Sequence, residues 1–205
     1  MADWQGQTAI IVGSGPSAAT TPLELARGRA RFIAVNDSWR LVPWADMLYA
    51  SDGIWWIDHN GVPEFKGRRL TSSPHAMRTF GIELFTSVGS TSGQRAISLA
   101  EKMKANPILL VGFEMHTGNG VHWHEPHQGR LRNPGKGEML VWRMDMERVA
   151  RRFAERGTRI LNCTPASALK CFRYLPFLEA INGGYDAPST DQPRYRDHAD
   201  GGTAV

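Results

Sequence analysis

The chain has 205 residues, of which 41% are hydrophobic and 21% charged, a composition that suits one globular domain with a sizeable core. The net charge is only +4 and the basic residues are scattered, so we do not expect a nucleic-acid-binding track. Two cysteines are too few for a disulfide scaffold, and neither a secretion signal nor an apolar run of the ~20 residues that span a bilayer is visible, so we expect a reduced, cytoplasmic protein.

Apolar runs typical of β-strands recur along the chain, and several are nearly continuous, as in parallel strands covered on both faces. They span residues 8–13, 31–36, 46–51, 69–72, 82–87, 108–113 and 158–163. Amphipathic segments predict helices at 92–105 and 142–156. This alternation predicts a single Rossmann-like, doubly wound α/β domain with a mainly parallel sheet over residues 1–182.

The first strand-like run stops at a glycine-rich turn, and a proline suited to the first helical position follows. The turn is formed by Gly13, Ser14, Gly15, Pro16 and Ser17. Glycines let the backbone approach a ligand closely, and free N–H groups at a helix start attract anions. The turn therefore predicts a phosphate site, against the alternative of a strand-to-helix turn that binds nothing.

Two common nucleotide motifs fit this turn less well. Gly13, Gly15 and Ala18 match a dinucleotide fingerprint, and Asp37 follows at about the expected twenty residues. However, Thr20-Thr21-Pro22 would cut short the crossover helix that such a site needs. A Walker-type loop is excluded because no Lys-Ser or Lys-Thr follows the glycines.

Residues 115–139 form a long segment without periodicity, which predicts a lid-like loop. It contains His116, His122, His124 and His127. A lid histidine could act as general base or acid, two or three could bind a transition metal, or all could be polar residues of a solvated loop. Residues 183–205 are polar and rich in Gly, Pro and Asp, which predicts a flexible tail.

Acidic and aromatic residues add further candidates near the ends of the predicted strands. Asp37, Asp52 and Glu114 each follow an apolar run, where a carboxylate could hold Mg²⁺ against phosphate oxygens or could simply be solvated. Trp55 and Trp56 belong either to the core or to a stacking wall for a base or sugar.

Six segments in chain order, IIVGSGPS, FIAVNDSW, DMLYASD, STSGQRAISLAEKM, PILLVGFEMH and RILNCTPASALKCF, carry a resemblance that covers about residues 8–180. The chain resembles the superfamily that joins bacterial CMP-sialic-acid sialyltransferases to archaeal-type 6-hydroxymethyl-dihydropterin diphosphokinases, with uncharacterised, often phage-encoded members. The resemblance implies a nucleotide site in which the glycine turn meets the phosphate and ribose. It also implies that the following residues line this site: Asn36, Thr91, Ser92, Gly93, Gly112 and Glu114.

For activity, the resemblance implies a transferase that uses a CMP-type sugar donor, with a lid histidine, His122 or His124, as base. The alternatives are ATP-dependent diphosphoryl transfer, with Mg²⁺ on the nucleotide, and a non-enzymatic nucleotide-binding phage accessory protein. The chain departs from the sialyltransferases at Ser14, where they have Asn, and at Ser51-Asp52-Gly53, where they have an Asn-Pro pair. The expected partners are a small nucleotide and a small acceptor, and the oligomeric state stays open.

Overall fold

A computed structural model describes residues 3–118 and 120–186. Its centre is one eight-stranded sheet with the order β5-β4-β3-β2-β1-β6-β7-β8, in which every neighbouring pair runs parallel. The strands are β1 (Ala9–Val12), β2 (Arg31–Val35), β3 (Met47–Ala50), β4 (Arg68–Thr71), β5 (Glu83–Leu84), β6 (Ile108–Val111), β7 (Ile160–Asn162) and β8 (Arg173–Tyr174). The predicted Rossmann-like α/β fold is therefore confirmed.

Strand order creates a switch point at the middle of the sheet. The chain builds outward from β1 to β5 and then returns through α3 (Ser92–Lys102) to place β6 on the other side of β1. Open α/β sheets bind ligands in the crevice at the carboxyl ends of the strands flanking such a point. The ends of β1 and β6 are therefore where a ligand site is expected.

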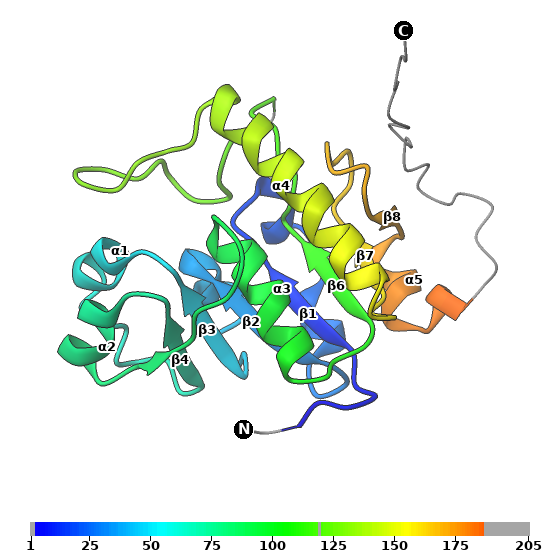
Figure 1. Cartoon of the computed structure of the whole chain (residues 1–205), viewed down its shortest axis with the longest axis horizontal. Coiled ribbons are helices and arrows are strands. Elements are labelled where there is room, and N and C mark those ends of the chain that lie inside the picture. Colours follow the sequence, from blue (N-terminus) through cyan, green and yellow to red (C-terminus); the bar gives the residue numbers. More distant parts are fainter. Residues whose placement is uncertain (1–2, 119, 187–205) are drawn as a thin grey trace, which may run out of the picture.

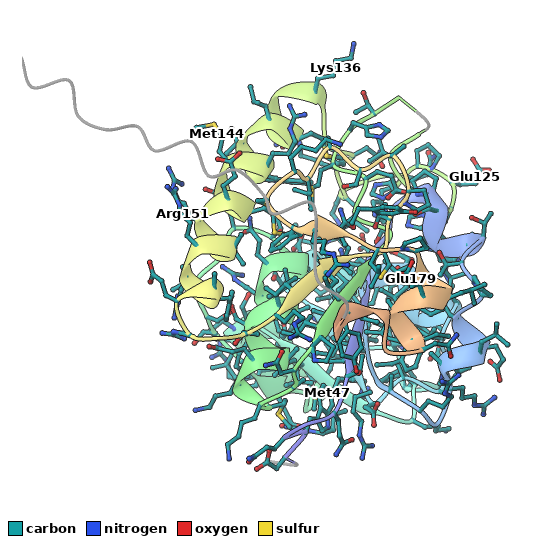
Figure 2. The ribbon with its side chains drawn as sticks, turned by 90° about the vertical axis from the view of Figure 1, so that its right-hand side faces the viewer. Met47, Glu125, Lys136, Met144, Arg151 and Glu179 are labelled. Atoms are coloured by element: carbon teal, nitrogen blue, oxygen red, sulfur yellow. The ribbon has the colours of Figure 1, made fainter. Side chains whose placement is uncertain are left out.

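Helices cover both faces of the sheet, because neighbouring residues of its fully buried central strands point to opposite sides. On one face, α3 and α4 (Lys136–Ala154) pack against a cluster that includes Ile11 and Leu110. On the other face, α1 (Gly53–Asp58) and α5 (Phe177–Ile181) pack with Ile10 and Val111. Figure 1 shows α3 and α4 side by side over the sheet, and in Figure 2 the labelled side chains of Met144 and Arg151 project from α4 away from it.

The connection after β1 contains two 3₁₀-helices, Pro16–Ala19 and Leu23–Ala26, in place of one long crossover helix. Pro22 lies between them as the residue before the second helix. This confirms the expectation that Thr20-Thr21-Pro22 cut the helix short.

Several boundaries and short elements differ from the sequence expectation. The helix α4 begins at Lys136 rather than at residue 142, since the Gly135 N–H donates to the Glu138 carboxylate at 2.9 Å and caps it; the irregular segment therefore ends at Gly135. The run at 82–87 yields only the two residues of β5. Neither β8 nor the helices α1, α2 (Pro74–Phe80) and α5 were expected, because helices of seven residues or fewer show too little helical periodicity and a two-residue strand has no apolar run.

The predicted flexible tail falls mostly outside the described residues, although Gly184–Asp186 form a short 3₁₀-helix. Among the helices of residues 3–118 and 120–186, none combines the length and the apolar character that crossing a membrane would require.

Candidate functional site

A cavity of about 330 Å³ lies at the carboxyl ends of β1 and β6, at the switch point of the sheet. The glycine turn, the start of α3, the irregular segment 115–135, called the lid below, and the first turns of α4 surround it. Its lining includes Gly13, Ser14, Gly15, Asn36, Ser51, Asp52, Thr91, Ser92, Gly93, Gly112, Phe113, Glu114, His116, His122, His127, Arg132, Met139 and Trp142.

The floor of the cavity is a close approach between the two backbone turns that follow β1 and β6. The Gly15 N–H donates to the Gly112 carbonyl at 3.0 Å, and Gly112 has a φ of +73° that disfavours any residue with a Cβ. A Cβ placed on Gly112 would lie 2.7 Å from the Gly13 carbonyl oxygen. Glycine is therefore required at Gly13, Gly15 and Gly112 because the two turns contact each other through their backbones.

Glu114 occupies the position beside the glycine turn where the sequence predicted a phosphate. Its Oε1 accepts the Ser17 N–H at 2.6 Å, so this amide at the start of the 3₁₀-helix is already bonded. The side chain belongs to a residue only 6% exposed, and its Oε2 has no hydrogen-bond partner among the described residues. A buried carboxylate oxygen without a partner favours a ligand that donates a hydrogen bond, such as a hydroxyl or an amine.

A second wall of the cavity is the N-terminus of α3. The Thr91 hydroxyl caps the helix by accepting the backbone N–H of Gln94. The Gln94 side-chain oxygen in turn accepts the backbone N–H of Thr91, and the two bonds form a capping box. The Ser92 hydroxyl accepts the Ser51 N–H at 3.0 Å and so fixes the helix start to the end of β3. The N-terminal amides of this eleven-residue helix and its dipole favour an anion at this wall.

Asn36 and Asp37 follow β2 but face different surroundings. Asn36 lines the cavity in a left-handed conformation with φ of +50°, and its Oδ1 is buried without a partner among the described residues. Asp37 lies behind it, only 4% exposed, and accepts hydrogen bonds from Trp55 Nε1 at 2.9 Å and His59 Nε2 at 3.1 Å.

The charge of Asp37 is stabilised by these partners. Burial by itself raises the pKa of the carboxyl, but the bonds from His59 and Trp55 outweigh it and hold this pKa far below its usual range. Burial likewise opposes protonation of His59, and the bond to Asp37 overcomes it and raises the His59 pKa. Through these hydrogen bonds, Asp37 connects α1 and its C-cap to the 3₁₀-helix Asn36–Arg40 that follows β2.

The lid is docked over the glycine turn through one tryptophan. The backbone N–H of Trp123 donates to the Ser14 carbonyl at 2.9 Å, and the indole Nε1 of Trp123 donates to the Ser38 hydroxyl at 3.4 Å. The Arg40 guanidinium lies 5.0 Å from the centre of its ring. Arg130, farther along the lid, pairs with Asp58 of α1.

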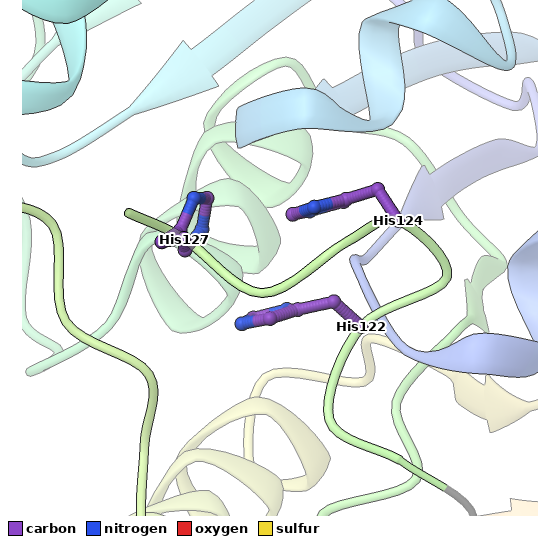
Figure 3. Close-up of side chains that lie close together, drawn as sticks. All are labelled: His122, His124 and His127. Atoms are coloured by element: carbon purple, nitrogen blue, oxygen red, sulfur yellow. The ribbon is translucent and has the colours of Figure 1, made fainter. Parts of the chain in front are cut away.

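Three lid histidines lie close together (Figure 3), and two of them, His122 and His127, line the cavity. The rings of His122 and His124 stack with centroids 4.8 Å apart, and His127 lies 4.9 Å and 5.0 Å from them. Burial, together with the neighbouring histidines, lowers the pKa of His122 to about 4, and burial lowers the pKa of His127 as well. His122 is therefore neutral near pH 7, and one of its two ring nitrogens carries a lone pair.

Most residues singled out from the sequence surround the cavity, whereas Pro16, Ser17, Asp37 and His124 do not line it. The suggested stacking wall of Trp55 and Trp56 is wrong, since both side chains are buried in the core. Phe113 and Trp142 are the aromatic residues that do line the cavity. No signal in the sequence singled out Trp142, because its place depends on how α4 crosses the sheet.

Of the acidic residues suggested for Mg²⁺, Asp52 and Glu114 line the cavity, whereas Asp37 does not. Asp52 caps α1 by accepting the Ile54 N–H at 2.8 Å. Asp37 accepts a hydrogen bond from Trp55, and Glu114 accepts one from the Ser17 N–H. Among the described residues, the group of three or more potential ligands close enough for one metal ion consists of His122, His124 and His127.

No protein-family model matches the chain, and no curated protein matches it. Among solved structures, the sialyltransferase CstII from Campylobacter jejuni, in complex with a substrate analogue, cytidine-5′-monophosphate, is similar with a TM-score of 0.56 and 13% identity. The match covers 84% of this chain and 86% of that one. Thiamin pyrophosphokinase from Geobacillus thermodenitrificans has a TM-score of 0.41 at 16% identity, with 75% of this chain and 58% of that chain covered.

A short-chain dehydrogenase/reductase from Serratia marcescens has a TM-score of 0.28 at 14% identity over 78% of this chain and 73% of that chain. The expectation of a phage origin finds no support in these comparisons. The likeness to CstII extends over most of both chains and, at this identity, it establishes that the two proteins share a fold.

Proposed function

We propose that this chain is a transferase that binds a nucleotide in the switch-point cavity and transfers a sugar from a CMP-type donor to a small acceptor hydroxyl. One observation carries the proposal: unpartnered polar atoms gather around this cavity. They are Asn36 Oδ1, Ser51 Oγ, Glu114 Oε2 and both ring nitrogens of His122. Buried polar atoms in proteins are nearly always bonded, so such a group indicates a polar ligand.

The two walls suit different parts of a nucleotide. Glu114 presents an acceptor, so hydroxyl or amino groups of the nucleoside would lie beside it. The phosphate would lie at the start of α3, near the Ser92 and Gly93 amides, because the Ser17 amide is already bonded to Glu114. Arg132, whose side chain is 85% exposed at the rim, is placed to reach the same anion.

His122 is the residue we propose as general base. It lines the cavity and its ring nitrogens have no hydrogen-bond partner among the described residues, whereas His124 faces Asp37. In the reaction, the His122 imidazole takes the proton from the acceptor hydroxyl as its oxygen attacks the sugar carbon. The bond from that carbon to the phosphate oxygen breaks, and the helix start stabilises the departing phosphate. The fold shared with a CMP-bound sialyltransferase supports a donor of this type.

Binding and chemistry are tested separately. Thermal-shift measurements with CMP, CDP, UMP, ATP with Mg²⁺, and NAD identify the donor class, since a ligand that binds only the native state raises the melting temperature. We expect CMP to give the largest shift. Stabilisation by ATP with Mg²⁺ alone would replace this proposal with diphosphoryl transfer, and stabilisation by NAD alone would reject both.

Hydrolysis of a CMP-linked sugar then tests the histidine. We expect His122→Ala to lower kcat about 10²- to 10⁴-fold, the usual contribution of general acid–base catalysis, with CMP affinity little changed. The matched control is His75→Ala, at an exposed histidine on α2, which should keep full activity. Tight CMP binding without hydrolysis or transfer in the unaltered protein would indicate a nucleotide-binding protein that is not an enzyme.

A further inference from the structure

We infer that His122, His124 and His127 form a binding site for a transition-metal ion of the Zn²⁺ class at the mouth of the switch-point cavity. The three side chains come from one six-residue stretch of the lid, which folds back so that their ring nitrogens lie within 4.8 Å of one another. Figure 3 shows the three rings grouped around a common space, with His127 facing the stacked pair.

The ring nitrogens are available for a metal. Nδ1 of His124 lies 2.8 Å from the Glu125 carbonyl oxygen, which accepts only, so Nδ1 carries the proton and Nε2 keeps its lone pair. That Nε2 is buried without a hydrogen-bond partner among the described residues, and so are both ring nitrogens of His122. A metal-binding histidine usually donates its other N–H to a backbone carbonyl or carboxylate, and His124 already has this arrangement.

The ligand set and its surroundings select the class of ion. Neutral imidazoles suit Zn²⁺, Cu²⁺, Ni²⁺ or Fe²⁺, whereas Mg²⁺ and Ca²⁺ need oxygen ligands. Three protein ligands leave a fourth position of a tetrahedral site open toward the cavity, which His122 and His127 line. Asp37 adds a negative charge 3.8 Å from His124 Nε2, partly balanced by Arg40 and His59, which bind its other oxygen.

Binding requires a small closure of the lid side chains. Zn–N bonds of about 2.0–2.1 Å in a tetrahedron bring the nitrogens to within about 3.4 Å of one another. The parallel rings of His122 and His124 must therefore turn so that their lone pairs converge. The three residues lie on an irregular loop, whose backbone can adjust to this rotation, although the side chain of His124 is only 8% exposed.

A bound ion has a consequence that rests on the proposed function. Coordination takes the lone pair of His122 that would accept the proton of the acceptor hydroxyl, so Zn²⁺ would inhibit sugar transfer. Metal binding itself does not depend on that activity. The site can therefore be tested on the purified chain whatever its reaction.

The experiment is a titration of the full chain, prepared without a polyhistidine tag and stripped with a chelator. We expect calorimetry with Zn²⁺ to give one ion per chain, and Co²⁺ to give the visible absorption of a tetrahedral site. His122→Ala, His124→Ala and His127→Ala should each weaken Zn²⁺ binding more than about tenfold, since even outer-shell changes reach that size. His75→Ala is the matched control and should bind as the unaltered chain does.

Circular dichroism of each variant shows whether it is folded, and Zn²⁺ should raise the melting temperature of the unaltered chain but not of the folded triple variant. No saturable binding at micromolar Zn²⁺, or binding that survives in the triple variant, would overturn the metal site. If CMP still stabilises the chain in that case, the proposed nucleotide site stands without the metal. If Zn²⁺ binds and CMP does not, the metal site stands alone.

Discussion

The two sides of the cavity are built in different ways. On the sheet side, the turns after β1 and β6 touch backbone to backbone at Gly15 and Gly112, and a buried Glu114 packs against them. On the lid side, a partly exposed irregular segment is held mainly by Trp123 and by the pairing of Arg130 with Asp58. We therefore expect the sheet side to be fixed when the core folds and the lid to open at a smaller cost in free energy.

This difference suggests that the two sides of the cavity would have different roles in the proposed function. In the proposed function, ligand positioning would belong to the sheet side, where the oxygens of Asn36 and Glu114 have no partner among the described residues. Proton transfer, and the proposed metal binding, would belong to the lid, of which His122 and His127 line the cavity. Three changes test this contrast, from the largest expected effect to the smallest.

Gly15→Ala should damage the sheet side most. A Cβ here would lie 1.6 Å from Glu114 Oε2 and 2.8 Å from the Gly112 carbonyl oxygen, so Glu114 must move and lose its bond to the Ser17 amide. Overpacking and a lost charged hydrogen bond together should lower the free energy of unfolding by about 3–5 kcal/mol in urea denaturation.

The control for that change is Gly137→Ala on α4, where an added Cβ meets no atom of the described residues within 4 Å. Alanine is the better helix former, so this variant should be as stable as the unaltered chain or slightly more stable. Equal stability of Gly15→Ala and Gly137→Ala would show that the backbone contact between the turns after β1 and β6 is not the rigid element we describe.

Trp123→Ala should loosen the lid and leave the sheet in place. It removes the indole contacts with Ser38 and Arg40. Trypsin should then cleave faster after Arg130 and Arg132, by about tenfold for each 1.4 kcal/mol of docking free energy lost. Cleavage after Arg151 in α4 is the internal control and should keep its rate. A parallel rise at Arg151 would mean that lid and sheet open together.

Glu83 lies away from both sides of the cavity, so Glu83→Gln should have the smallest effect on the free energy of unfolding. Arg68 on β4 binds Glu83 on β5 through Nε at 2.7 Å and a second nitrogen at 2.6 Å, and this bond lowers the Glu83 pKa below its usual 4.5. Because the folded-state pKa is the lower one, the pair stabilises the protein above about pH 4.5 and loses its contribution as the pH falls further.

The carboxylate of this pair is 49% exposed, so its loss should cost less than about 1 kcal/mol at pH 7. Urea denaturation of both proteins at pH 7 and pH 3.5 measures the difference. A gap that widens on acidification would contradict the assigned ion pair.

Local patterns in the sequence predict the elements that carry a strong signal. The nearly continuous apolar runs of β1, β2, β3 and β6 indicate buried strands, and the buried stripe of α3 is long enough to show the helical period. Gly13 and Gly15 indicate a sharp turn or a close backbone approach, since both favour residues without a Cβ, and in the structure both glycines lie at a close approach. What they approach is another turn of the chain, which only tertiary contacts could reveal.

The sequence by itself determined a parallel α/β sheet with polar residues at its carboxyl edge, because alternation, burial and turn chemistry are properties of neighbouring residues. Tertiary structure alone decided that Glu114 bonds the Ser17 amide, that Trp55 and Trp56 enter the core, and that three lid histidines share one space. These outcomes depend on contacts between segments far apart in the chain or on the path of an irregular loop. No local pattern encodes such distances.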